Sequence, residues 1–244
     1  MRYQDKNITS LTDLIDNLKQ NVAGINLPIW FRGQTNSAWD LEPKLMRTPD
    51  QPSETFYFNR FKQDASIILN HQPKSEFDWL FLMQHYGIPT RLLDWSESPL
   101  VALYFAISES PDADGALYVL LPTELNKISN YRPDHEFEIP SFEDEHLQNY
   151  LPTTIARENK SKLQPMAAIA PRNSSRMQAQ QGVFTISHRE NIYINKAGLE
   201  ETSTHTWRYI IPKEIKEDLK KELKLLGFSK FQLFPELESI SEIF

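Results

Sequence analysis

A short apolar stretch near the start of the sequence runs directly into an arginine and a glycine, in WFRGQ at residues 30–34. An unpaired charge among apolar side chains is costly, so Arg32 needs a partner. That partner is either a carboxylate of the chain or an anionic ligand, because a guanidinium suits both carboxylate and phosphate. In a strand, Arg32 and Gln34 share one face, and Gly33 allows a ligand or another backbone to come close.

A second group of polar side chains lies in QHYGIPTRLLDWSESPLVALYFA, residues 84–106, between two apolar segments. Loops on rigid supports are where sites are commonly built. Arg91 and Asp94 can pair with each other, or Asp94 can hold Arg32. The candidate site residues of this stretch are His85, Tyr86, Thr90, Arg91, Asp94 and Trp95.

A third polar group, RMQAQQGVF at residues 176–184, precedes an apolar strand. Its glutamines, Gln178, Gln180 and Gln181, offer amide groups that both donate and accept hydrogen bonds. The alternative interpretation is a polar turn that leads into the strand.

Composition excludes several classes of protein. The chain has 244 residues, a formal charge of -7 and no cysteine, so it has no disulfide, no catalytic thiol and no Cys-ligated zinc. The negative charge argues against bulk binding to nucleic acid or to an anionic membrane. The N-terminus has no apolar signal core, and the longest apolar run, Leu100 to Ile107, is too short to span a bilayer. We therefore expect a soluble, cytoplasmic protein.

Common phosphate and metal motifs are missing. The seven glycines are too far apart for a dinucleotide fingerprint or a P-loop, and neither GxSxG nor HExxH occurs. The six histidines show no pair at helical spacing, so we expect no metal site.

Periodicity predicts one α+β domain with a mixed or antiparallel sheet flanked by helices. We expect an N-terminal helix within 1–24, an extended or loop-like segment at 88–95, a surface insertion at 122–165 and a C-terminal helical segment at 213–244. Further helices are expected at 53–70, 76–87 and from Ser98, and strands near 28–33, 116–121, 165–171, 182–188 and 204–212.

Together these stretches resemble the FRG domain, a bacterial family that takes its name from a Phe-Arg-Gly signature. The resemblance lies in FRGQ at 31–34, in residues 84–106, in QQGVF at 180–184 and in the closing GFSKFQLFPELESISEIF. It implies a single FRG domain over 1–244, with a split core like that of ADP-ribosyltransferases and NAD as substrate. It also points to a role in bacterial defence or toxin-like activity.

The same resemblance implies roles for individual residues. Arg32 corresponds to the polar residue on the first core strand that contacts the dinucleotide, and the loop TRLLDWSES lines the nicotinamide pocket. The expected nucleotide contacts are Arg32, Gln34, His85, Tyr86, Thr90, Arg91 and Trp95. The expected catalytic candidates are Asp94, Glu97 and Gln181.

Cleavage of the nicotinamide–ribose bond passes through an oxocarbenium-like state, which a nearby carboxylate stabilises. Where the transferase motif has a catalytic glutamate, this sequence has glutamines. Either Asp94 or Glu97 supplies the charge, or the domain binds a nucleotide without cleaving it. The expected function is an NAD-consuming transferase or glycohydrolase, with a protein as one candidate acceptor. The alternative is a non-catalytic nucleotide-binding or interaction module.

Overall fold

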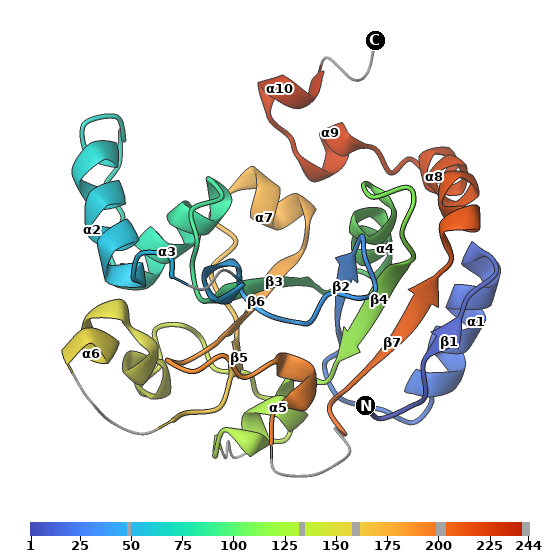
Figure 1. Cartoon of the computed structure of the whole chain (residues 1–244), viewed down its shortest axis with the longest axis horizontal. Coiled ribbons are helices and arrows are strands. Elements are labelled where there is room, and N and C mark those ends of the chain that lie inside the picture. Colours follow the sequence, from blue (N-terminus) through green and yellow to red (C-terminus); the bar gives the residue numbers. More distant parts are fainter. Residues whose placement is uncertain (48–49, 132–134, 158–161, 199–203, 241–244) are drawn as a thin grey trace.

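The computed structural model describes residues 1–47, 50–131, 135–157, 162–198 and 204–240. Seven strands form one sheet in the order β1-β7-β4-β2-β3-β6-β5, and all pairs are antiparallel except β1 with β7 (Figure 1). The expectation of an α+β fold with a mixed sheet is confirmed. The strands are β1 (Lys6–Asn7), β2 (Trp30–Gln34), β3 (Leu92–Ser96), β4 (Gly115–Leu120), β5 (Met166–Ala168), β6 (Gly182–Ile186) and β7 (Thr206–Ile211).

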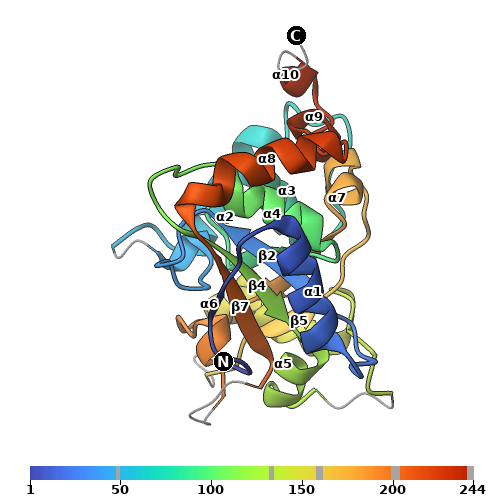
Figure 2. The same ribbon diagram turned by 90° about the vertical axis from the view of Figure 1, so that its right-hand side faces the viewer.

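Helices cover both faces of this sheet (Figures 1 and 2). On one face, buried side chains of α1, α4 and α8 pack over β2, β4 and β7, and those of α2 and α3 pack over β5 and β6. On the other face, Leu125 of α5 packs with side chains of β2, β3, β4 and β6. The helices are α1 (Leu11–Val22), α2 (Glu54–Ala65), α3 (Glu76–His85), α4 (Pro99–Ile107), α5 (Pro122–Ile128), α6 (Pro152–Arg157), α7 (Ser175–Ala179), α8 (Lys216–Leu225), α9 (Lys230–Leu233) and α10 (Leu237–Ile240).

Serines begin the main helices. The side chains of Ser10, Ser53, Ser75 and Ser98 each accept a hydrogen bond from a backbone N–H in the first turn of α1, α2, α3 and α4. Such N-caps satisfy donors that have no partner within the helix. Pro99 follows Ser98 at the first helical position, where a missing N–H costs nothing. These starts are therefore local properties of the sequence.

The sheet is weakly joined at its centre. In the described residues β2 and β3 share one register pair, Phe31 with Ser96, whereas β2–β4 and β3–β6 each share five. A continued antiparallel ladder would place Gly33 opposite Asp94, but the strands have separated at that point. The sheet therefore consists of two well-paired halves that diverge between β2 and β3.

Gly33 is required by the helix that crosses it. A Cβ atom at this position would overlap the carbonyl oxygen of Ala102 and lie 2.5 Å from the amide nitrogen of Ala106, both in α4. Gly115 on β4 meets the same helix, since its Cβ would lie 2.5 Å from the carbonyl oxygen of Ala106. The two glycines let α4 approach the sheet more closely than any side chain would allow.

Three segments differ from the sequence-based expectation. Residues 92–96 form strand β3 at the centre of the sheet, where we expected an extended or loop-like segment. The 122–165 segment, expected as a surface insertion, contributes Leu125, Phe142, Leu147 and Tyr150 to the core. Its acidic composition concealed the spacing of these apolar side chains. Helix α2, expected within a helix over 53–70, ends at Ala65.

We expect Gly33→Ala to lower the free energy of unfolding by about 3 kcal/mol, since α4 must move away from the sheet. In a chain of this size that corresponds to a melting temperature about 6 °C lower or more. Gly182→Ala is the matched control, because its Cβ would meet only Met177 atoms at 3.6 and 3.8 Å. Thermal unfolding by circular dichroism compares the two variants, and equal melting temperatures would contradict the steric argument.

Candidate functional site

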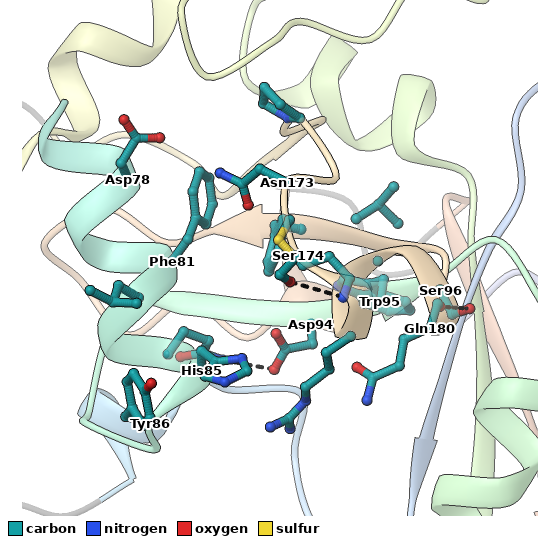
Figure 3. A pocket seen from close by; sticks show the side chains of 18 of the residues that line it. Asp78, Phe81, His85, Tyr86, Asp94, Trp95, Ser96, Asn173, Ser174 and Gln180 are labelled. Atoms are coloured by element: carbon teal, nitrogen blue, oxygen red, sulfur yellow. Dashed lines mark hydrogen bonds between the residues drawn. The ribbon is translucent and has the colours of Figure 1, made fainter. Parts of the chain in front are cut away.

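A cavity of about 850 Å³ lies over the centre of the sheet, where β2 and β3 separate. Strands β2, β3 and β6 contribute to its floor, and side chains of α3, α4 and the segment around α7 form its walls. Figure 3 shows Asp94 between His85 of α3 and Gln180 after α7. The volume is in the upper part of the range for small-molecule sites.

Arg32 lies where the two halves of the sheet diverge. Its Nη1 donates a 2.6 Å hydrogen bond to the backbone carbonyl oxygen of Asp94. This bond occupies an acceptor that a continued ladder between β2 and β3 would have used. The Nε of Arg32 is enclosed and has no hydrogen-bond partner, and the described residues include no ion pair to this guanidinium. Arg32 therefore contributes to the fold and is also a positively charged member of the cavity lining.

Asp94 is oriented by a chain of hydrogen bonds. The hydroxyl of Thr90 donates to Oε1 of Gln84 at 2.6 Å, and Nε2 of Gln84 donates to Oδ2 of Asp94 at 2.7 Å. The hydroxyl donor fixes which way the Gln84 amide faces, and the amide in turn fixes the carboxylate. Asp94 remains exposed within the cavity.

The end of α3 brings these residues together. Gly87 adopts φ +71°, and the amides of Gly87 and Ile88 donate to the carbonyls of Gln84 and Met83 at 3.0 and 2.9 Å. This is the Schellman arrangement, which ends a helix and turns the chain back. The turn places Thr90 and β3 beside the last turn of α3, within reach of Gln84.

Arg91 is a structural residue. Its Nε pairs with Oε2 of Glu54 at 2.7 Å, and its Nη1 and Nη2 donate to the carbonyls of Ser187 and Tyr150 at 2.8 and 2.5 Å. Both members of the ion pair are buried, and Glu54 also accepts from the Arg91 amide at 3.1 Å. The side chain of Arg91 has no free face toward the cavity.

The cavity brings together five of the ten predicted site residues. Those that line it are Arg32, His85, Tyr86, Asp94 and Trp95. The other five, Gln34, Thr90, Arg91, Glu97 and Gln181, are not part of its lining.

Each of these outlying residues has another environment. Gln34 is buried and donates to the carbonyl of Asp40 at 3.1 Å, and Thr90 reaches the cavity only through Gln84. Glu97 forms an ion pair with Arg172. Gln181 is exposed, with φ +47°, at the turn before β6. The contacts expected for these five therefore require either another surface or a different conformation.

Several cavity residues were not assigned from the sequence. Gln84 is the first residue of the 84–106 stretch, and Arg176 and Gln180 belong to the third polar group. The sequence patterns that predicted a site therefore included these three residues. Phe81 and Asn173 lie on a buried helix and in a loop, and no local pattern distinguished them. Ser96 accepts from the amide of Ser98 at 3.0 Å and donates to the carbonyl of Gln180 at 2.7 Å.

Burial lowers the pKa of two basic groups that line the cavity, Arg32 and His85. Burial lowers the pKa of Arg32 to about 10, although the nearby Asp94 carboxylate opposes the shift. Arg32 remains charged at neutral pH. Burial, followed by the charge of Arg176, also lowers the pKa of His85 below its usual value. The neutral form of His85 is favoured, so Arg32 and Arg176 carry the positive charge of this part of the cavity.

The described residues offer neither a metal-binding cluster nor a membrane-spanning helix. The described part of the chain contains no cluster of three or more histidine or carboxylate side chains that could hold a metal ion. None of its described helices combines the length and the apolar character that crossing a bilayer requires.

Comparison with known proteins gives one match. Residues 28–115 match the family model of the FRG domain. No curated protein and no solved structure matches the chain. The matched segment contains Arg32, Gln84, Thr90 and Asp94, whose hydrogen bonds join β2 to β3 and orient the Asp94 carboxylate.

We expect Glu54→Gln to lower the free energy of unfolding by about 3 kcal/mol, because it leaves the Arg91 charge buried without a counter-ion. Asp64→Asn is the control, since Asp64 pairs with Arg60 on the exposed face of α2 at 2.9 Å and should matter by less than about 0.5 kcal/mol. Urea unfolding measures both. Equal effects would indicate that the buried pair contributes no more than the exposed one.

Proposed function

We propose that this chain, whose residues 28–115 match the family model of the FRG domain, binds NAD in the central cavity and breaks its nicotinamide–ribose bond. The observation that carries the proposal is the arginine beside a carboxylate at the cavity floor. Arg32 has an enclosed Nε without a partner, and Asp94 is held facing the same space.

The cationic groups suit the pyrophosphate. A buried guanidinium without an ion pair gains more from an anion than an exposed one, because little water competes for it. Arg176 lines the same cavity and adds a second positive charge. Aromatic side chains for ring contacts are also present in the lining, among them Phe81, Tyr86 and Phe105.

Asp94 is our candidate for the catalytic carboxylate. When the bond between the ribose C1′ and the nicotinamide nitrogen breaks, the electron pair leaves with nicotinamide and positive charge develops on the sugar. A carboxylate fixed nearby stabilises that charge, and water or an acceptor nucleophile then bonds to C1′. Gln84 and Thr90 would hold Asp94 in place. Glu97 is paired with Arg172, so Asp94 is favoured over Glu97.

This assignment modifies the set of residues expected from the family resemblance. Arg91 is replaced by Arg176 as the second arginine of the cavity, since Arg91 is enclosed with Glu54. Gln180 lines the cavity and Gln181 does not. An ADP-ribosyltransferase-like split core remains part of the proposal, and the divergence of β2 and β3 beside Arg32 supports it.

A second function is favoured by one specific observation. Arg32 bonds a backbone carbonyl where the sheet divides, and Gln84 occupies one Asp94 oxygen. Both polar groups thus have structural tasks, as in a module that binds a nucleotide without cleaving it. The two functions differ in whether nicotinamide is released.

We expect NAD to bind the wild-type protein in isothermal titration calorimetry and to release nicotinamide, measured by chromatography with and without a protein acceptor. Arg32→Gln should weaken binding about tenfold or more, since a charge-assisted contact is lost. Asp94→Asn should keep binding and lower the release rate about 100-fold or more, because its charge is lost while its shape remains.

The controls for this experiment lie on α2. Arg60→Gln and Asp64→Asn change the same residue types in an exposed pair outside the cavity, and both should behave as the wild type. Binding without release by the wild type would favour the second function. No binding of NAD would overturn the nucleotide proposal in both its forms.

A further inference from the structure

The C-terminal segment lies on the rim of the cavity. Residues 229–237 comprise α9, the link Phe234–Glu236 and the start of α10. In Figures 1 and 2 α9 and α10 stand at the same end of the molecule as α4 and α7, and project from its body. None of these residues belongs to the cavity lining, yet Leu233, Phe234 and Glu236 contact residues that do.

Phe234 is the central contact. The guanidinium of Arg176 lies over its ring, 4.6 Å from the centroid, and the ring of Phe105 meets it edge-on at 5.8 Å. Arg176 belongs to α7 and Phe105 to α4, so one side chain connects two walls of the cavity. The preceding residue, Leu233, accepts a 3.0 Å hydrogen bond through its carbonyl from Nε2 of Gln180.

Glu236 reaches the third wall. Its Oε1 lies 3.6 Å from Nε2 of His85, at the end of α3, and this buried oxygen has no hydrogen-bond partner. The segment therefore touches α3, α4 and the α7 region within four residues, through one hydrogen bond, two contacts to the Phe234 ring and a long pair between Glu236 and His85. Gly227, with φ +84°, ends α8, and Phe228 packs on the core immediately before the segment.

We propose that residues 229–237 form a strap across the rim of the cavity, and that release of the Phe234 and Glu236 contacts controls the entry of ligand. The strap is anchored at Phe228 and closes against three of the elements that line the cavity, α3, α4 and α7. The role of the ligand rests on the proposed function, whereas the opening itself concerns this chain alone. Displacement of Phe234 would also free Arg176 and Gln180 to bind the ligand.

The absence of cysteine allows a direct test of opening. Ser96→Cys places the sole thiol of the chain inside the cavity, at a position that is 5% exposed. Its rate of alkylation by N-ethylmaleimide then measures access. We expect Phe234→Ala in this background to raise the rate about tenfold or more, and Phe234→Leu and Glu236→Gln to raise it by smaller factors.

A second buried thiol separates local from global opening. Thr123→Cys lies in α5 outside the cavity, is 3% exposed, and replaces a hydroxyl that has no hydrogen-bond partner. Its alkylation should be unchanged in every strap variant. Equal Ser96→Cys rates with and without the strap substitutions would overturn the proposal, as would acceleration of both thiols by the same factor.

The alkylation assay uses no nucleotide, so it tests whether the strap controls access to the cavity even if NAD does not bind. If NAD does bind, Phe234→Ala should raise its association rate in stopped-flow measurements, and an unchanged rate would show that the strap does not limit entry. If NAD does not bind but the strap variants accelerate alkylation of Ser96→Cys alone, the proposed function is overturned and the strap proposal is supported.

Discussion

The hydrogen bond from Arg32 to the backbone carbonyl of Asp94 joins the fold to the cavity. Strands β2 and β3 belong to one sheet but share a single register pair, and this bond lies where their ladder stops. A carbonyl left without a donor at the centre of a sheet would be costly. The arginine satisfies that carbonyl while keeping the strands apart. The same geometry that opens the sheet therefore also places a cation at the floor of the opening.

The three residues of the Phe-Arg-Gly signature have three separate tasks. Phe31 packs in the core with α1 and α4, and its backbone forms the last pair with β3. Arg32 bridges to β3 and faces the cavity. Gly33 has no side chain because α4 passes directly over it. Three consecutive residues thus set the position of a helix, the divergence of the sheet and the charge of the site.

The polar residues of the second stretch divide in a similar way. Gln84, Thr90 and Asp94 form one hydrogen-bonded chain that ends in the cavity, whereas Arg91 turns away from it to Glu54. Thr90 and Arg91 are adjacent in the chain, yet one side chain reaches Gln84 and the other reaches Glu54. The strap extends the site at its rim, where Phe234 and Glu236 hold side chains from three walls.

Local signals in the sequence determined the helix starts, most strands and the α+β class. Serine caps, the helix-ending Gly87 and alternating apolar residues act over a few positions, so they can be read directly. The sequence alone also indicated that Arg32 needs a partner and that Gly33 permits a close approach. Tertiary structure decided that Arg32 bonds the carbonyl of Asp94 and that α4 is the helix approaching Gly33, because both lie about 60 or more positions away along the chain. It also assigned Glu54 to Arg91 and brought Arg176 and Gln180 to the cavity. Such pairings depend on how the strands are ordered in space, and residue types at short spacing do not determine that order.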